Sequence, residues 1–158
     1  MAESQILLVD DDQLLLSAFA ETLRGQGYLA QPAISGDIAL VLLSEGVPFR
    51  LLITDIFMPG LLDGFALARQ ARDLFPGIPI IYTTGYPQVA HIRGCSAPYG
   101  TVLVKPFEIN TMLMTIAMAL GDCLHSDCSM SAGDSRSRPR DAWRAVPEVD
   151  IGRCYETK

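Results

Sequence analysis

Short apolar runs alternate with helix-like periods along the first 120 residues of the chain. Runs rich in Ile, Leu and Val that end at acids, Gly or Pro predict strands, and apolar positions with a helical period predict helices. The predicted strands cover residues 5–9, 28–33, 51–55, 78–83 and 101–104. The predicted helices cover residues 13–24, 35–43, 63–75 and 108–120, with a weak candidate at 86–94. This alternation with short links predicts an α/β fold in three layers, a doubly wound parallel sheet covered by helices.

Apolar stripes on the predicted helices mark the side chains that should face the sheet. On the third helix Leu67, Ala71 and Leu74 share one face. On the last helix the inward positions are Ile109, Met112, Leu113, Ile116 and Leu120. These stripes predict where the core contacts each helix.

The chain changes character after Gly121. Ser, Arg, Asp, Gly and Pro become prominent, and no apolar period runs between Ser126 and Arg140. Such a composition buries too little apolar surface to fold alone. We therefore expect one domain at residues 1–122 and a flexible tail at 123–158 without an output domain, in which Trp143 and Val146 could dock onto the domain.

Composition argues against several classes of protein. The 158 residues are 49% hydrophobic and 19% charged, which suits a globular domain. The net charge of -6 argues against nucleic-acid binding, which needs a cationic surface. No basic leader or membrane-length apolar segment is present in the sequence, so we expect a cytoplasmic protein without membrane contact. The four cysteines suggest reduced thiols, and the spacing of Cys123 and Cys128 fits no common zinc pattern.

Polar side chains stand where the predicted strands end. The run Asp10–Asp12 follows the first strand, Asp55 ends the third, Thr84 follows the fourth and Lys105 follows the fifth. Because the carboxyl ends of parallel strands meet at one edge of the sheet, these side chains can converge there. The alternative for Asp12 and Asp55 is structural, since single acids also cap helices and form turns.

Converging carboxylates need a cation. Two carboxylates about 4 Å apart repel by about 4 kcal/mol at an effective dielectric constant of about 20, and a hard divalent ion or an ammonium group offsets this repulsion. Mg²⁺ fits best, because it accepts few protein oxygens and keeps sites for water and phosphate oxygens. Lys105 is the only lysine before Lys158, and its compact ammonium suits a phosphoryl oxygen. The alternative is a lysine that snorkels at the sheet edge.

Residues 4–120 resemble the receiver domain of bacterial two-component response regulators. Leu8-Val9-Asp10-Asp11 is similar to the acidic pair of that family, and Asp55-Ile56-Phe57-Met58-Pro59-Gly60 to its phosphoacceptor loop. Thr84-Gly85 resembles its switch hydroxyl with a small neighbour, and Lys105-Pro106-Phe107 its closing motif. The acid pair or Lys105-Pro106 alone would be weak, but together the motifs are highly specific. The resemblance implies a flavodoxin-like (βα)5 fold with strand order 2-1-3-4-5. The amino-acid sequences of the loops resemble those of receivers attached to or paired with hybrid sensor kinases.

The resemblance also implies roles for these residues. Asp55 would accept a phosphoryl group from a sensor histidine kinase or a phosphotransfer protein. Asp10, Asp11, Asp55 and the main-chain carbonyl of Phe57 would hold Mg²⁺. Lys105 and the Thr84 hydroxyl would bind phosphoryl oxygens, and the peptide bond between Lys105 and Pro106 would be cis. Such a transfer depends on positioning and charge neutralisation more than on other help from the protein.

The sequence departs from the family pattern at two places. Val102 stands three positions before Lys105, where the family often has an aromatic that moves with the switch hydroxyl, and Tyr99 is wrongly spaced to replace it. Phe57 and Tyr86 are aromatic at positions where fast-hydrolysing receivers can carry polar side chains. The first departure leaves open whether an aromatic side chain moves with the switch hydroxyl. The second departure predicts a long-lived acyl phosphate.

The last helix offers a possible contact surface. Met114 and Met118 lie one turn apart, opposite its core stripe, and would form a partner or dimer face near Lys105 unless the tail covers it.

Three functions fit the sequence. The first is a stand-alone receiver that acts as a Mg²⁺-dependent signalling switch through protein contacts and turns over no external substrate beyond its phosphodonor. The second is a non-phosphorylated scaffold of the same fold, or a receiver segment related to a hybrid kinase. The third, a phosphatase with an aspartyl nucleophile, would need a second acid two residues after Asp55, where Phe57 stands.

Overall fold

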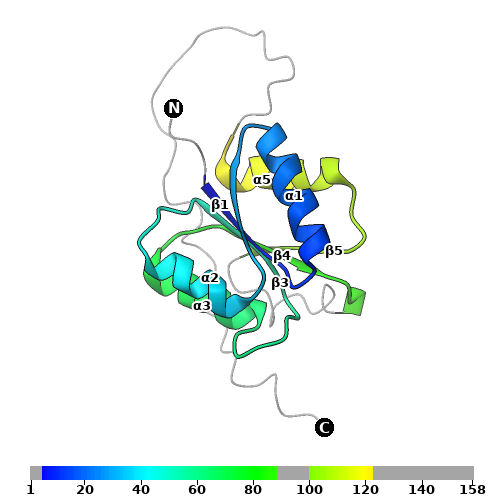
Figure 1. Ribbon diagram of the computed structural model, residues 1–158. Helices are drawn as coiled ribbons and strands as arrows, with labels where there is room; N and C mark the ends of the chain where they lie inside the picture. Colours follow the sequence, from blue (N-terminus) through cyan, green and yellow to red (C-terminus); the bar gives the residue numbers. More distant parts are fainter. Residues whose placement is uncertain (1–4, 89–99, 123–158) are drawn as a thin grey trace, which may run out of the picture. The chain divides into compact units, whose positions relative to one another are not determined.

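The computed structural model describes residues 5–88 and 100–122, all within one compact unit, Met1–Cys123 (Figure 1). The strands are β1 (Gln5–Val9), β2 (Leu29–Ala33), β3 (Leu51–Asp55), β4 (Ile80–Thr84) and β5 (Gly100–Val104). The helices are α1 (Gln13–Gly25), α2 (Gly36–Ser44), α3 (Gly64–Leu74) and α5 (Ile109–Leu120). The predicted tail at 123–158 and most of the weak helix at 86–94 lie outside the described residues, so these predictions stay untested.

The five strands form one sheet in the order β2-β1-β3-β4-β5, and every neighbouring pair is parallel. Both the fold class and the strand order are therefore confirmed. Parallel pairing places the carboxyl ends of all strands at one edge, where acids and Lys105 were expected to meet. Within residues 5–88 and 100–122, no helix is both long and apolar enough to cross a membrane.

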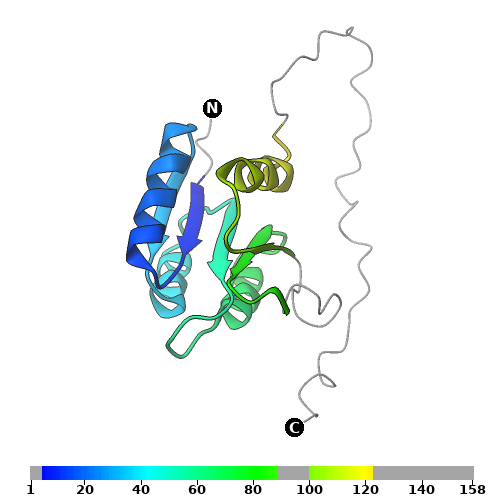
Figure 2. The same cartoon turned by 90° about the vertical axis from the view of Figure 1, so that its right-hand side faces the viewer.

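The sheet is buried on both faces. Leu7 and Leu52 point into a core with α2 and α3, whereas Ile6 and Ile53 point into a second core with α1 and α5. Figures 1 and 2 show the two helix pairs on opposite sides of the sheet. This two-sided burial explains why the central strands are continuous apolar runs without polar alternation.

Side chains at the carboxyl edge of the sheet cap the N-termini of three helices. Asp12 accepts backbone N–H groups of Leu14 and Leu15, so its expected role as the cap of α1 is confirmed. Ser35 and Asp63 cap α2 and α3 in the same way. These caps satisfy N–H groups that have no partner within the helix, and they fix where each helix leaves the edge.

Two predicted core positions were wrong. Leu74 and Ile109 were expected to face the sheet, but both are exposed. Both lie at a helix terminus, since Leu74 is the last residue of α3 and Ile109 the first of α5. Ala68 and Ala117 are buried instead, next to Leu67 and Ile116. Small side chains at these places let the helix backbones approach the sheet.

Candidate functional site

Backbone hydrogen bonds beyond the strand ends position the predicted site residues. The Asp10 N–H donates to the Ala33 carbonyl at 3.2 Å, and the Lys105 N–H donates to the Thr84 carbonyl at 2.7 Å. Asp55 is the last residue of β3 and pairs in register with Thr83. The sheet itself therefore holds the backbones of Asp10, Asp55 and Lys105 at one edge.

The Lys105 ammonium joins two carboxylates from different strands. Its Nζ lies 2.6 Å from Asp10 Oδ2 and 2.7 Å from Asp55 Oδ2. The side chains of Lys105, Asp10 and Asp55 are 21%, 4% and 11% exposed. A lysine snorkelling into water would not make these bonds, so the convergence expected from the sequence is present in the structure.

Lys105 stays charged in this setting. Burial is the largest single effect and lowers its pKa, but the hydrogen bonds and negative charges of Asp10 and Asp55 together outweigh it. The net result is a pKa raised above the ordinary lysine value of 10.5. The ammonium therefore remains a permanent positive charge at neutral pH.

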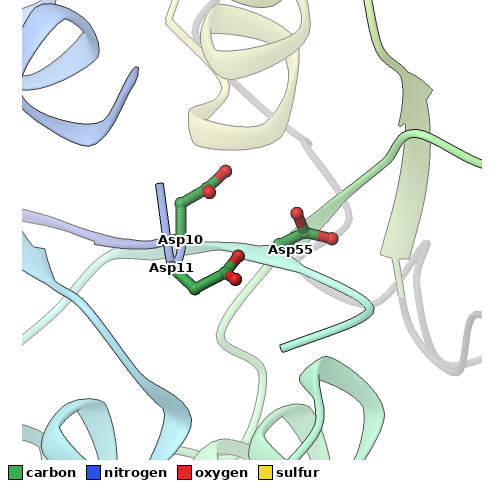
Figure 3. Close-up of side chains that lie close together, drawn as sticks. All are labelled: Asp10, Asp11 and Asp55. Atoms are coloured by element: carbon green, nitrogen blue, oxygen red, sulfur yellow. The ribbon is translucent and has the colours of Figure 1, made fainter. Parts of the chain in front are cut away.

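Three carboxylates form a cluster at this edge (Figure 3). One oxygen from each of Asp10, Asp11 and Asp55 lies within 4.8 Å of the others. Asp10 and Asp55 are buried while Asp11 is exposed, which leaves one side open to solvent. An all-oxygen set of this size fits a hard divalent cation such as Mg²⁺, whose remaining positions water and phosphate oxygens can fill.

Each buried acid is also oriented by the backbone. Asp10 Oδ1 accepts the N–H of Asp12 at 2.9 Å, and Asp55 Oδ1 accepts the N–H of Phe57 at 3.1 Å. The Phe57 backbone therefore borders the cluster, where its carbonyl was predicted to be a metal ligand. These bonds leave Oδ2 of each acid for Lys105 or another cation.

Thr84 ends β4 beside these groups and is fully buried. Its hydroxyl accepts the Tyr86 N–H at 3.1 Å, and its carbonyl accepts the Lys105 N–H. Thr84 therefore lies next to Lys105 along the edge, and the Thr84 hydroxyl accepts its hydrogen bond within a local turn. The bond between Lys105 and Pro106 is cis, as the family resemblance implied.

Gly64 is a positioning residue that the sequence analysis did not assign. It begins α3, its N–H donates to the Ile56 carbonyl at 2.9 Å, and a Cβ on it would overlap the carbonyl oxygen of Asp55. Only glycine lets the start of α3 rest on the backbone of Asp55. The sequence offers one signal for this role, a glycine directly after Asp63, the residue that caps α3.

The two expected aromatic flanks lie together. The rings of Phe57 and Tyr86 meet edge to face with centroids 5.1 Å apart, and each side chain is about half exposed. Val102 packs in the core with α2 and α3 opposite the buried Tyr82, whereas Tyr99 lies outside the described residues. The position three residues before Lys105 is therefore part of the core and carries no aromatic ring.

The chain combines a doubly wound parallel sheet with a lysine-bridged acid cluster at its carboxyl edge, and solved receiver proteins share this fold. The family model described as the response regulator receiver domain matches residues 6–117. The chain belongs to this family of two-component signal transduction proteins.

Relatives include both a separate receiver and a longer kinase. The chain is 36% identical over 117 residues to the response regulator receiver protein CpdR of Brucella abortus, which covers 73% of the chain and 96% of CpdR. It is 32% identical over 114 residues to the sensor kinase CckA of the same species, which covers 70% of the chain but only 12% of CckA. The receiver unit is thus common to proteins of different length.

Solved structures agree with the fold. A response regulator receiver protein from Sinorhizobium medicae has 31% identity and a TM-score of 0.68, and the match covers 76% of this chain and 96% of that one. TrrA from Thermotoga maritima, solved in complex with Mg²⁺ and BeF, has 26% identity and a TM-score of 0.64, with 74% and 99% covered. Receiver domains bind Mg²⁺ at their acidic pocket, and the acid cluster of this chain fits that property.

Proposed function

We propose that Asp55 accepts a phosphoryl group from the phosphohistidine of a sensor histidine kinase or a phosphotransfer protein, and that the phosphorylated chain acts as a signalling switch. The observation that carries the proposal is the geometry of Asp55. Its carboxylate is recessed, fixed at Oδ1 by the Phe57 N–H and paired at Oδ2 with the Lys105 ammonium. A carboxylate held in this way is positioned to attack phosphorus.

The chemistry needs one bond to form and one to break. A carboxylate oxygen of Asp55 bonds to phosphorus while the phosphorus–nitrogen bond breaks, and the electron pair of that bond returns to the imidazole of the donor. Asp10, Asp11, Asp55 and the Phe57 carbonyl would hold Mg²⁺, which supplies positive charge to the phosphoryl oxygens when bound. Lys105, already bonded to Asp55, and the Thr84 hydroxyl would bind oxygens of the transferred group.

The chain is proposed to act through protein contacts rather than by turnover of an external substrate. The match along 96% of CpdR supports a receiver that works without an attached output domain. The match to a short part of CckA supports the alternative, a receiver segment related to a hybrid sensor kinase. In both cases the partner delivers or reads the phosphoryl group at the same edge of the sheet.

Labelling with acetyl phosphate tests this function against a scaffold of the same fold. The purified chain should incorporate about one phosphoryl group per molecule when Mg²⁺ is present and lose most of that labelling in EDTA, since the acid cluster needs a cation. A scaffold would show no label under either condition. Radiolabel transfer from a panel of sensor kinases would then identify the donor.

The acyl phosphate should be long-lived. Phe57 and Tyr86 are linked through their N–H groups to Asp55 and Thr84, and their paired rings place no carboxamide or carboxylate there to orient an attacking water. Replacing Phe57 with Asn and Tyr86 with Ser should speed loss of the label by about tenfold, equivalent to about 1.4 kcal/mol in the barrier. Release of labelled phosphate in magnesium buffer measures this rate. The control is Leu74→Asn, an exposed position on the far part of α3, and rapid loss from the wild-type chain would contradict the prediction.

We also propose that the outer face of α5 contacts a partner or a second copy of the chain. Met114 and Met118 are exposed one turn apart, and α5 contains no charged residue from Ile109 to Leu120. Replacing both methionines with Glu should weaken self-association or kinase docking by about tenfold, because charge replaces apolar contact. Sedimentation and transfer kinetics measure the two effects. The matched control is Ile38→Glu with Val41→Glu on α2, and no change in either property would exclude the proposed face.

A further inference from the structure

An aromatic pair joins α1 to the segment that carries Lys105. The rings of Phe19 and Phe107 are stacked, with centroids 5.5 Å apart and an interplanar angle of 25°. Phe19 belongs to α1, and Phe107 follows Lys105 by two residues, between β5 and α5. Both rings are partly buried and pack against the core that contains α1 and α5. The pair therefore connects two parts of the chain that are far apart in the sequence.

Hydrogen bonds hold the backbone of Lys105 from one side. Its N–H donates to the Thr84 carbonyl at 2.7 Å, but the next residue, Pro106, has no N–H to donate. Among the described helix starts, α1, α2 and α3 have side-chain caps, whereas Glu108, the N-cap residue of α5, makes no side-chain cap hydrogen bond. On its other side, the segment after Lys105 is held by the stacking of Phe107 on α1.

Helix α1 is also joined to the acid cluster at its start. Asp12, the cap of α1, donates its N–H to Asp10 Oδ1 at 2.9 Å. Asp10 Oδ2 lies 2.6 Å from the Lys105 ammonium. The ring pair links the segment of Lys105 to the same helix. Both partners of this ion pair are therefore connected to α1, and the contacts form a closed ring.

The Lys105 side chain needs such support. A lysine has a long, flexible stem and loses much conformational entropy when its ammonium is held in one place. The Lys105 ammonium nevertheless lies 2.6 Å from Asp10 Oδ2 and 2.7 Å from Asp55 Oδ2. Since the place of the ammonium depends on where its backbone is fixed, a looser segment after Lys105 would weaken both bonds.

We propose that the stacked pair of Phe19 and Phe107 positions Lys105. By holding the segment after β5 against α1, the pair keeps the ammonium between Asp10 and Asp55. The inference rests on the proposed function where it concerns phosphoryl transfer, because Lys105 would bind oxygens of the transferred group. In the resting chain it concerns a different property, the competition of the ammonium and a divalent cation for the same two carboxylates.

Phe107→Leu tests the positioning role, because leucine keeps an apolar side chain but cannot stack. Labelling at saturating acetyl phosphate and Mg²⁺ should slow by about fivefold to tenfold, since Lys105 is less well placed for the phosphoryl oxygens. Mg²⁺ binding to the unlabelled chain should tighten by about threefold, since a looser ammonium competes less for the carboxylates. Calorimetric titration with MgCl₂ measures this affinity. A merely structural disturbance of the site would weaken labelling and Mg²⁺ binding together.

Phe107→Tyr is the conservative variant. It keeps the ring, so the labelling rate and the Mg²⁺ affinity should stay within about twofold of the wild type. The matched control is Phe75→Leu, which removes another partly buried ring. Phe75 follows α3, and its carbonyl accepts the Ile78 N–H just before β4 begins, at the opposite edge of the sheet. This control should lower the unfolding free energy but leave labelling and Mg²⁺ binding unchanged.

A second background shows whether the pair acts through Lys105. The Lys105→Met chain has no ammonium to position, so adding Phe107→Leu should change its Mg²⁺ affinity by less than about 1.5-fold. If Phe107→Leu tightens Mg²⁺ binding as strongly in this background as in the wild type, the pair does not act through Lys105 and the proposal is overturned.

The outcomes separate the positioning role from the proposed function. If acetyl phosphate does not label the wild type, the proposed function fails, and the Mg²⁺ titrations decide the positioning role by themselves. If the wild type is labelled but Phe107→Leu changes neither the labelling rate nor the Mg²⁺ affinity, the positioning role fails alone. It also fails if Phe107→Leu weakens Mg²⁺ binding, or if Phe107→Tyr behaves like it. Should Phe107→Leu not fold, Phe19→Leu removes the same stacking from α1 and gives the same readouts.

Discussion

Asp55→Asn is expected to remove phosphoryl labelling from the chain. The amide has the size of the carboxylate but is not a nucleophile towards phosphorus, and it no longer attracts the Lys105 ammonium as a charge. Loss of a nucleophile of this kind lowers the rate by about 10³-fold or more. Incorporation of label from acetyl phosphate in magnesium buffer measures the effect.

The matched control for this substitution is Asp63→Asn. Asp63 caps α3 at the same edge but lies outside the acid cluster, and Asn also caps helices well. The control should therefore label at close to the wild-type rate. Labelling of the Asp55→Asn variant at the wild-type rate would show that another residue is the acceptor.

Lys105→Met is expected to make the stability of the chain depend more strongly on magnesium. Without the ammonium, the nearly buried carboxylates of Asp10 and Asp55 repel each other, so the free energy of unfolding in EDTA should fall by about 1–3 kcal/mol. Mg²⁺ should restore more stability to the variant than to the wild type, because the ion no longer competes with Lys105 for the acids. Urea unfolding over a series of Mg²⁺ concentrations measures both effects.

Alkaline pH gives the same comparison a second readout. The pKa of Lys105 is raised above 10.5 in the folded chain, so its stabilising effect is present below that pH and is lost as the pH rises through the folded value. The pKa of Tyr28 is also raised, first by burial and then by the charge of Asp122, but this effect is common to both proteins. In EDTA the wild-type and Lys105→Met unfolding free energies should therefore converge above pH about 10.5. A constant difference from neutral to alkaline pH would contradict the role of the ammonium.

Much of the fold followed from the sequence because the signals were local. Apolar runs such as Leu51–Asp55 ended at acids or Gly, and Asp12 and Asp63 stood where helices begin. The bonds of Lys105 to Asp10 and Asp55 could be anticipated for a simple geometric reason. Parallel strands bring distant residues to the same edge.

Other features depended on three-dimensional packing that no local pattern records. Leu74 and Ile109 lie at the ends of α3 and α5 and are exposed, although they continue the apolar stripes. Within Asp10–Asp12, the position of each acid relative to the strand end decides which one is buried, which is exposed and which caps α1. The close approach of Gly64 to Asp55 required the path of the loop between them.

The contact of Gly64 with the carbonyl of Asp55 also determines how a displacement of this edge of the sheet is transmitted to α3. Backbone rests on backbone there, so no side-chain rotamer can absorb a displacement. A shift of the carboxyl end of β3 would therefore move α3 as a rigid body. The helix is therefore mechanically coupled to the acceptor strand, whatever residues cover its outer surface.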